Sequence, residues 1–308
     1  MSARDRLNER LASGEVVLID GGMGTELQAR GVPMSSAAWS GLANLDQSDV
    51  VRQIHEDNIR AGAEVIIANT FATSRLMMRA AGVEERYEEV NRRAVEAAML
   101  AREATGAPDV AVAGSISDGV AGASSDFLDQ APLEGLALRD AFAEHARALA
   151  EAGVDLLALE MITAPSYGVA AVETALETGL PVWLGVSAGL SAEGKLCALG
   201  GEDGSFDELL GALVRPELAA VNVMHTSVEA TTPALEAVRR IWSGPLGAYP
   251  ESGGWIPPNW VFSDFTPEAF ASEALGWVND GGVRIIGGCC GMRPNFIATL
   301  HDALAARP

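Results

Sequence analysis

Two adjacent cysteines, Cys289 and Cys290, lie within the sequence GGCCG near the end of the chain. Two thiolates can bind one Zn²⁺ ion, and the flanking glycines let the backbone approach the ion closely. The alternative is a turn of small residues, in which the two cysteines pack as small hydrophobic side chains. The segment therefore predicts either a soft-metal site or a tight strand-to-loop turn.

Polar residues of several kinds follow short apolar runs elsewhere in the sequence. In chain order these segments are Asp20-Gly21-Gly22, Asn69-Thr70-Phe71, Gly114-Ser115, Glu160-Met161, Ser187-Ala188, Asn222-Val223-Met224-His225, Tyr249-Pro250-Glu251 and Gly288-Cys289-Cys290-Gly291. Carboxylates, amides, thiols and an imidazole can bind an amino acid, hold a metal or transfer a proton. Their repeated place after apolar runs predicts one active site, provided that the runs are strands whose ends meet.

The apolar runs are rich in Val, Ile, Leu and Ala, as expected for parallel strands that are buried on both faces. They cover residues 16–20, 64–69, 109–114, 155–160, 182–188, 218–222, 246–249 and 283–288. Segments with helical periodicity alternate with them, at residues 47–61, 87–104, 137–152, 164–178, 205–214, 233–242, 267–279 and 294–306. The pairs Thr232-Pro233 and Thr266-Pro267 predict helix starts, and Gly153 predicts a helix end.

This alternation predicts an α/β fold, a single (β/α)8 TIM barrel formed by residues 1–308 as one domain. A doubly wound open sheet is the alternative, because the number of strands alone does not prove closure. The long segments after the first three strands, residues 21–46, 70–86 and 115–136, would form the mouth of the barrel. The carboxyl ends of all strands lie at that mouth, so the polar segments would share it.

The composition excludes several classes of protein. The 308 residues include 42 Asp and Glu against 21 Lys and Arg, a formal net charge of −21, so nucleic acid and anionic membranes are not expected partners. The N-terminal sequence lacks the apolar segment of a secretory signal. Only three cysteines occur, which excludes a disulfide framework and predicts a reduced, cytoplasmic protein.

Six segments can be compared with known families: DGGMGTELQARG (20–31), NTF (69–71), LLALE (156–160), AVN (220–222), YPESG (249–253) and GGCCGMRPNFI (287–297). Together, and in this order, they resemble the homocysteine S-methyltransferase family, which includes betaine–homocysteine and S-methylmethionine–homocysteine methyltransferases. The resemblance extends over residues 14–304. It implies an enzyme that transfers a methyl group to the sulfur of homocysteine.

The resemblance also implies roles for the polar residues. The family binds the homocysteine sulfur through a Zn²⁺ ion held by three cysteines, and Cys289 and Cys290 match two of these ligands. Asp20 and Glu160 match carboxylates that are expected to hold the substrate's amino group. The other expected substrate-binding residues are Gly21, Gly22 and Thr25, which would shape the floor of the site and supply backbone N–H groups, and Asn69, Thr70, Asn222 and Tyr249.

One position departs from the family's pattern. Val223 stands where the resemblance places the first metal-binding cysteine, directly after Asn222, and valine cannot bind a metal. His225 is the better replacement, because imidazole is a good zinc ligand and residues two apart in an extended segment point the same way. The alternatives are that His225 is an acid–base or hydrogen-bonding residue of the pocket, or that Cys197 supplies the third ligand from the loop after the fifth strand.

Aromatic residues in the long loops could surround a sulfonium or quaternary ammonium group through cation–π attraction, or could simply cover the end of the barrel. These residues are Trp39, Phe71, Trp255 and Trp260. The remaining histidines fall within helical segments and are expected to be surface or helix-packing residues: His55, His145 and His301.

These observations predict a zinc-dependent enzyme that transfers a methyl group from a sulfonium or quaternary ammonium donor to homocysteine, giving methionine. Cys289, Cys290 and His225 would be both the metal ligands and the catalytic residues. Because Val223 removes a ligand, two alternatives stay open: a divergent relative that acts on another thiol or methyl donor, and a metal-free barrel that binds an amino acid. Formation of a homo-oligomer stays open as well.

Overall fold

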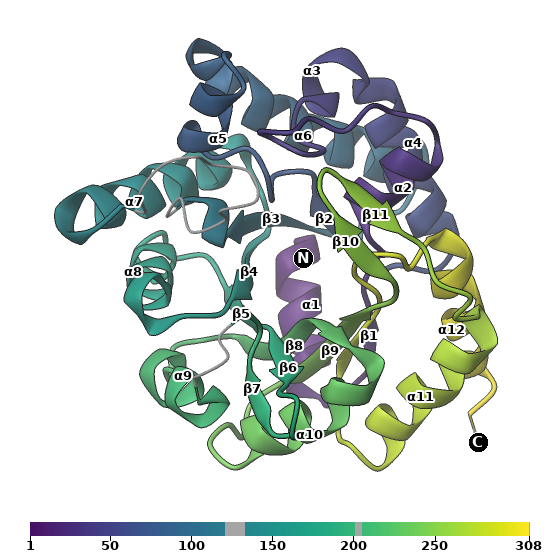
Figure 1. The fold of residues 1–308 in the computed structure, drawn as a ribbon. Helices are drawn as coiled ribbons and strands as arrows, with labels where there is room; N and C mark the ends of the chain where they lie inside the picture. Colours follow the sequence, from purple (N-terminus) through teal and green to yellow (C-terminus); the bar gives the residue numbers. More distant parts are fainter. Residues whose placement is uncertain (121–132, 201–204, 308) are drawn as a thin grey trace.

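The computed structural model describes residues 1–120, 133–200 and 205–307, and in this part of the chain eight parallel strands form a closed barrel surrounded by helices (Figure 1). The strands lie in the order β1-β12-β9-β8-β5-β4-β3-β2. A parallel bridge between Ile19, next to β1, and Val65 of β2 joins the two ends of this sheet. The predicted (β/α)8 barrel is therefore confirmed, and the open doubly wound sheet is excluded.

The barrel strands occupy the predicted apolar runs, although several are shorter than those runs. Their bounds are β1 Val17–Leu18, β2 Val65–Ala68, β3 Ala111–Ser117, β4 Leu156–Ile162, β5 Val182–Val186, β8 Ala220–Ser227, β9 Leu246–Glu251 and β12 Ile285–Ile286. Successive side chains point to opposite faces of the sheet. In β8, Val223 packs in the layer that contains helix residues such as Val238, whereas Met224 packs inside the barrel with Trp183.

The eight outer helices also lie close to their predicted positions. They are α4 Ser48–Arg60, α6 Tyr87–Ala104, α7 Gly135–Ala152, α8 Pro165–Leu176, α9 Phe206–Leu213, α10 Val228–Arg239, α11 Pro267–Asn279 and α12 Pro294–Ala305. Gly153 ends α7 with a φ of 97°, and the Thr266 side chain caps α11, both as predicted. Among the described residues, no helix is both long enough and apolar enough to cross a membrane.

The predicted start of one helix at Thr232-Pro233 is wrong. Helix α10 begins at Val228, and the Ser227 hydroxyl caps it by accepting a hydrogen bond from the backbone N–H of Ala230. Strand β8 ends at Ser227, so the chain passes from strand to helix without a loop. Pro233 consequently lies inside the helix, beyond the first turn, where its missing N–H removes one intrahelical hydrogen bond.

An additional helix, α1 (Ala3–Ala12), lies across the end of the barrel opposite to the mouth and is visible through the barrel in Figure 1. Its buried residues Ala3, Leu7 and Leu11 pack against the interior side chains of the barrel. A capping box between Ser2 and Asp5 fixes its first turn. This helix, which was not predicted from the sequence, fills the lower end of the barrel interior.

The segments predicted to form the mouth do so, but they are more ordered than loops. They contain the helices α2 Met23–Ala29, α3 Ala43–Asp46 and α5 Arg75–Ala80 and the 3-10 turns η1 Glu84–Arg86 and η2 Asp118–Val120. Two small hairpins join them, β6 Ala188–Leu190 with β7 Leu196–Ala198, and β10 Gly254–Ile256 with β11 Asn259–Val261. Within the predicted mouth segment 115–136, residues 121–132 lie outside the described residues.

The three histidines expected to lie away from the site are located on outer helices. His55 on α4 and His145 on α7 are fully buried, and burial lowers their pKa values to about 3 and about 4. His145 shares a hydrogen bond with the Tyr87 hydroxyl, at 3.0 Å. His301 on α12 is exposed. The expectation that these are helix-packing or surface residues agrees with these positions.

Candidate active site

A cavity of about 540 Å³ opens at the carboxyl ends of the strands. Residues that line it come from strand ends and from the mouth segments, and they include Gly21, Gly22, Asn69, Glu160, Met224, His225, Tyr249, Glu251, Cys289 and Cys290. The volume is in the range of small-molecule sites, and most of the lining is apolar with a few convergent polar groups. This is the arrangement expected of a site for a small organic substrate.

Three potential metal ligands meet on one side of the cavity. The side-chain donor atoms of His225, Cys289 and Cys290 all lie within 4.8 Å of one another. The Nδ1 atom of His225 is 3.6 Å from the Sγ atom of Cys289. The sequence therefore identified three residues that the fold brings together, although 64 positions separate His225 from Cys289.

The two cysteines and the histidine also perturb one another's protonation. A hydrogen bond with Cys290, together with burial, raises the pKa of the Cys289 thiol well above its usual range. Burial by itself lowers the pKa of His225, but the hydrogen bond and negative charge of Cys289, followed by the charges of Glu251 and Asp118, raise this pKa to about 9. The cluster thus places one imidazole beside a thiol and within the field of two carboxylates, Glu251 and Asp118.

Backbone hydrogen bonds hold the cysteine-containing loop against the end of β9. The N–H of Cys289 donates to the carbonyl of Pro250 at 2.8 Å, and the N–H of Ser252 donates to the carbonyl of Cys290 at 2.9 Å. Gly291 adopts a left-handed φ of 81°, and a Cβ atom there would lie 1.8 Å from the carbonyl oxygen of Ser252. The glycine after the two cysteines is therefore required both for its conformation and for its lack of a side chain.

Replacing Gly291 by alanine should lower the free energy of unfolding by about 2–3 kcal/mol, because the new methyl group clashes with backbone and the φ is unfavourable. Gly31→Ala is a matched control: Gly31 has the same kind of φ, 82°, but a Cβ atom there would meet nothing within 4 Å. We expect the control to cost about 1 kcal/mol or less. Urea denaturation of both variants measures the difference, and equal losses would contradict this explanation of Gly291.

His225 reaches the cavity through an irregularity in β8. The register between β8 and β9 shifts between Met224 and Ser227, and His225 has a left-handed φ of 42°. Val223 is buried in the layer between the sheet and the helices and does not line the cavity. The expectation that Val223 and His225 point the same way in an extended strand is therefore wrong, because the backbone at His225 is not extended.

Cys197 does not join the three-residue cluster. It lies on β7 of the β6–β7 hairpin, where its Sγ atom donates to the carbonyl oxygen of Gly189 at 3.5 Å. The group of potential metal ligands found among the described residues contains Cys289 and Cys290 but not Cys197. Of the two candidates for a third protein ligand, only His225 is in position.

Glu160 of β4 lines the cavity, whereas Asp20 is buried and is not among the lining residues. The Ser115 hydroxyl donates to the Glu160 carboxylate. Burial raises the pKa of Glu160 to about 7, although hydrogen bonding by Ser115 and the charge of His225 oppose the shift. One oxygen of Asp20 accepts a hydrogen bond from the backbone N–H of Ile67 at 2.8 Å. Burial, and then the charge of Glu160, raise the pKa of Asp20 well above its usual range.

The Gly21–Gly22 turn shapes the floor of the cavity, but its N–H groups are already used within the protein. The N–H of Gly21 donates to Asn58 Oδ1 at 3.3 Å, and the N–H of Gly22 donates to the carbonyl of Met292 at 2.9 Å. Thr25 donates to the carbonyl of Gly22 and accepts from the N–H of Gly291. The expectation that this turn offers N–H groups to a substrate is therefore wrong, because those groups tie the turn to its surroundings.

The remaining predicted site residues divide into lining and supporting residues. Asn69 lines the cavity, but its amide is engaged with Ser40 and Asn44. Thr70 is fully buried and bonds to the backbone of Ser115. Asn222 is buried inside the barrel, and its amide atoms have no hydrogen-bond partner among the described residues.

Tyr249 lines the cavity near Glu160. Burial and the neighbouring charge of Glu160 raise the pKa of its phenol well above the usual range. Its hydroxyl makes no hydrogen bond of regular geometry within the described residues, but it lies close enough to Glu160 to lower the pKa of that carboxyl.

Four aromatic residues form one wall of the cavity, as the sequence suggested. Trp39 makes edge-to-face contacts with Phe71 and Trp255, with ring centroids 6.1 and 5.8 Å apart, and Trp260 lies beside His225 at 5.9 Å. The described lining residues include Asp118, Glu160 and Glu251 but no Lys or Arg. Aromatic faces together with carboxylates favour a cationic ligand.

Backbone strain is concentrated at this cavity. Among the described residues, the non-glycine residues with positive φ are Trp39, Met161 and His225, at 38°, 53° and 42°. All three line the cavity. Left-handed backbone costs a bulky side chain free energy, and such residues are typical of functional sites.

Glu251 lies in a strand-end segment that the sequence assigned to the site, Tyr249-Pro250-Glu251, but no role was predicted for it. Its Oε2 atom lies 3.2 Å from Nε2 of His225. The signal was present, because Glu251 follows Tyr249 and Pro250 at the end of the seventh barrel strand, but nothing in the sequence showed that it faces an imidazole. Met161 was likewise named at a strand end without a role, whereas Asp118, which also lines the cavity, was not predicted.

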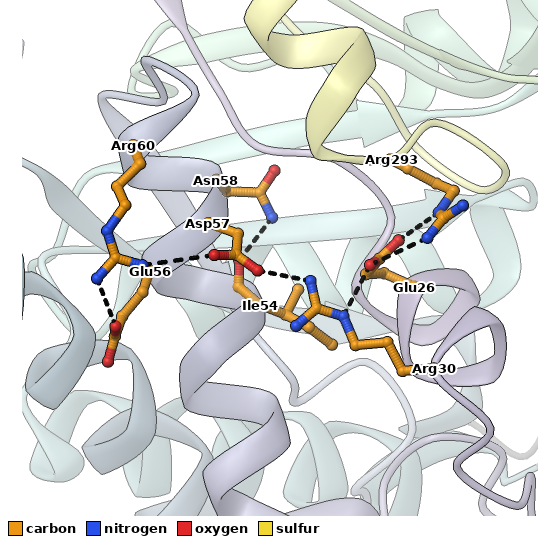
Figure 2. A network of polar contacts seen from close by, with 8 residues as sticks. All are labelled: Glu26, Arg30, Ile54, Glu56, Asp57, Asn58, Arg60 and Arg293. Atoms are coloured by element: carbon orange, nitrogen blue, oxygen red, sulfur yellow. Dashed lines mark hydrogen bonds and ion pairs between the residues drawn. The ribbon is translucent and has the colours of Figure 1, made fainter.

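A network of ion pairs holds the floor of the cavity to the segment that follows the cysteines (Figure 2). Glu26 of α2 is buried and pairs with Arg30 at 2.8 Å and with Arg293, the residue before α12, at 2.6 Å. Arg30 also reaches Asp57 of α4. Because a buried carboxylate flanked by two guanidinium groups resists displacement, this network fixes α2 relative to the cysteine loop.

Comparison with known proteins is consistent with this geometry. The sequence profile described as homocysteine S-methyltransferase matches residues 17–304. The chain is 29% identical over 318 residues to a homocysteine S-methyltransferase of Escherichia coli strain K12, covering 97% of this chain and 99% of that protein. It is 30% identical over 325 residues to an S-methylmethionine–homocysteine S-methyltransferase of Pongo abelii, covering 98% of this chain and 82% of that protein.

A solved structure has the same fold. The metallated form of the E. coli homocysteine methyltransferase MmuM superposes with a TM-score of 0.78 at 27% sequence identity, covering 96% of this chain and 99% of that one. The similarity thus extends over the whole barrel, including both segments that carry the cysteine and histidine cluster. The chain belongs to the homocysteine S-methyltransferase family, and it is a methyltransferase enzyme.

Proposed function

We propose that this enzyme transfers a methyl group to the thiol of homocysteine and uses a zinc ion held by Cys289, Cys290 and His225. The observation that carries the proposal is the meeting of these three donors in the cavity that also contains Glu160. The names of the related proteins supply the acceptor, homocysteine. The chemistry of the donor set supplies the metal, since two thiols and an imidazole form a typical catalytic zinc site with one position left for substrate.

The spacing of one donor pair, Cys289 and His225, suits zinc. A tetrahedral zinc ion with Zn–S of about 2.3 Å and Zn–N of about 2.0–2.1 Å separates its sulfur and nitrogen ligands by about 3.6 Å. The distance between Cys289 Sγ and His225 Nδ1 is 3.6 Å. When bound here, zinc would keep the homocysteine sulfur as a thiolate at neutral pH.

The carboxylates are proposed to hold the amino end of homocysteine. Glu160 reaches the cavity with one oxygen fixed by Ser115, which leaves the carboxylate oriented for an ammonium group. Asp20 is buried outside the cavity lining, and it and Glu160 repel each other when both are ionised, which raises the pKa of Asp20. An ammonium group near both would relieve this repulsion, so the pair favours a cationic group over a neutral one.

The methyl donor is proposed to be a sulfonium compound such as S-methylmethionine. The aromatic wall of Trp39, Phe71 and Trp255 and the lack of described Lys or Arg in the lining both suit a cation. In the transfer, the thiolate attacks the methyl carbon, and the electrons of the breaking C–S bond remain on the donor sulfur. S-methylmethionine and homocysteine would thus yield two molecules of methionine.

Metal analysis combined with a methyl-transfer assay tests the proposal. We expect about one zinc per chain, methionine formation from homocysteine and S-methylmethionine, and loss of activity on chelation with recovery on adding zinc. Nickel and iron are assayed in parallel, and a panel of other thiols accompanies homocysteine. Transfer to another thiol alone would favour a divergent relative, and amino-acid binding without transfer would favour a binding protein; either result overturns the proposal.

Proton release on ligand binding tests the role of Glu160. Its pKa is about 7, well above the usual value for a carboxyl, so at pH 6.5 it is largely protonated, and it must lose the proton to pair with an ammonium group. Methionine affinity should therefore rise with pH up to about 7, and binding at pH 6.5 should release up to one proton. Calorimetry in buffers of different ionisation enthalpy measures this release; methionine has no thiol proton to confuse the count. Release that persists in Glu160→Gln would contradict the assignment.

We further propose that residues 1–308 fold as one domain that acts in the cytoplasm. The barrel is continuous from β1 to β12, which supports a single unfolding transition. The cysteines are free, and the proposed site needs its thiols reduced, as they are in the cytoplasm. Calorimetric unfolding tests the first statement, cell fractionation the second, and analytical ultracentrifugation whether the enzyme is a monomer or a homo-oligomer.

A further inference from the structure

We propose that Glu251 is a positioning residue that fixes the ring of His225, so that Nε2 carries the proton and Nδ1 faces the metal position. This inference rests on the zinc site proposed above and assigns a role to a residue outside the ligand set. It concerns how a histidine, which can present either of two nitrogens, is made to present one of them.

The two ring nitrogens of His225 face different groups. Nδ1 lies 3.6 Å from Cys289 Sγ, and Nε2 lies 3.2 Å from Glu251 Oε2. An imidazole that binds a metal has given up one proton and keeps one N–H donor beside the lone pair that binds the metal. Because a carboxylate can only accept, the proton that remains belongs on Nε2, and the lone pair of Nδ1 then faces the thiols.

Within the described ranges of the chain, no Lys or Arg pairs with Glu251. Its one ion pair among the described residues is with His225, and no other described group makes a hydrogen bond to its buried Oε2 atom. A buried carboxylate without a donor is unfavourable. The N–H of His225 is close enough but is not aligned for a regular hydrogen bond, so a small rotation of the ring is expected when Nδ1 binds a metal.

The surroundings of His225 limit its motion to such a small rotation. The Trp260 ring packs beside the imidazole, with centroids 5.9 Å apart. The Gln28 side chain fixes the backbone of Trp260 through two hydrogen bonds. Gln28 accepts from the N–H of Trp260 at 2.7 Å and donates to the carbonyl of Trp260 at 2.8 Å. The imidazole therefore lies between a fixed indole, a thiol and a carboxylate.

The strand register explains why Glu251 is in place. Ser227 of β8 pairs with Glu251 of β9 after the register shift that begins at Met224. The shift displaces His225 toward the cavity, and the end of the neighbouring strand supplies the carboxylate. One backbone irregularity thus positions the ligand and its acceptor together.

The carboxylate also changes the charge of the site. Two thiolates and one Zn²⁺ ion sum to zero, and the Glu251 carboxylate brings the total to −1. An acceptor on the outer nitrogen of a metal-binding histidine fixes its orientation and increases its basicity, and loss of such an acceptor typically weakens metal binding 10- to 100-fold. Replacement by Gln keeps an acceptor oxygen and removes the charge, whereas replacement by Leu removes both.

Zinc affinity in three variants tests the proposal, measured by competition with a chromophoric chelator on the full chain. Glu251→Leu should bind zinc about 10- to 100-fold more weakly than the wild type, and Glu251→Gln should remain within about 5-fold of it. Asp207→Asn, which removes an exposed carboxylate on α9 that does not line the cavity, is the matched control and should leave zinc affinity unchanged. Circular dichroism checks that each variant is folded.

The ring tautomer provides a readout that a merely structural role would not change. Nitrogen-15 NMR of the zinc-loaded wild type should show His225 protonated at Nε2, and Glu251→Leu should show a mixture or the other tautomer. Wild-type zinc affinity in Glu251→Leu, or an Nδ1 proton in the wild type, would overturn this inference while leaving the zinc site intact. A wild type that binds no zinc would overturn the proposed function and, with it, this role.

Discussion

His225→Ala is expected to reduce zinc affinity roughly 100- to 1000-fold. Zinc sites with four ligands bind with about 10–16 kcal/mol, so one ligand contributes about 3–4 kcal/mol. The cavity wall around position 225 offers no replacement thiol, since Cys197 is engaged with Gly189 on a separate hairpin. Competition with a chelator on the purified variant measures the loss.

Two further variants make this experiment specific. His301→Ala removes an exposed histidine from α12 and should leave zinc affinity unchanged. Val223→Cys placed in the His225→Ala background should not restore zinc binding, because the side chain at 223 faces the helix layer. Restoration by the new cysteine would show that β8 can change its register, and full zinc binding by His225→Ala would remove His225 from the site.

Glu160→Gln is expected to weaken binding of homocysteine or methionine by about 2–5 kcal/mol, or roughly 30- to 4000-fold, because it removes a buried charge from an ammonium group. The variant preserves the shape of the side chain and can still bond to Ser115. Isothermal titration calorimetry measures the affinity. Zinc content should remain at the wild-type level, which separates a substrate effect from damage to the metal site.

Asp20→Asn provides a graded comparison. Asp20 bonds to the backbone N–H of Ile67 and does not line the cavity, so its effect on an ammonium group is through space. We expect this variant to weaken binding less than Glu160→Gln does. Unchanged affinity in both variants would show that the amino group binds elsewhere, for example at Glu251.

The barrel could be predicted because its elements have strong local signals. Buried parallel strands appear as continuous apolar runs, and Thr266 and Gly153 mark helix boundaries with side-chain and backbone chemistry that a sequence displays directly. The start of α10 was misplaced because Thr232-Pro233 also has the form of a helix start. Only the end of β8 at Ser227, a feature of the tertiary fold, makes the earlier cap possible.

The residue types of the site could be predicted from the sequence, but the directions in which their side chains point could not. Cys289, Glu160 and His225 were identified by their positions at the ends of strands, because a barrel brings the ends of its strands together. The direction of His225 depends on a left-handed backbone and a register shift, which no propensity reveals. The role of Glu251 depends on the same shift and was invisible for that reason.

The strained backbone at Trp39, Met161 and His225 has a consequence for how this sequence can change over generations. At Met161 and His225, asparagine would relax the backbone at a gain of about 1 kcal/mol each, whereas at Trp39 the loss of a buried indole packed against Phe71 and Trp255 would outweigh that gain. A population of variants selected only for resistance to heat should therefore accumulate Asn at 161 and 225 while it keeps Trp39. The same library grown under conditions in which survival depends on the enzyme's activity should retain the original residues, so these two codons would record whether the activity was under selection.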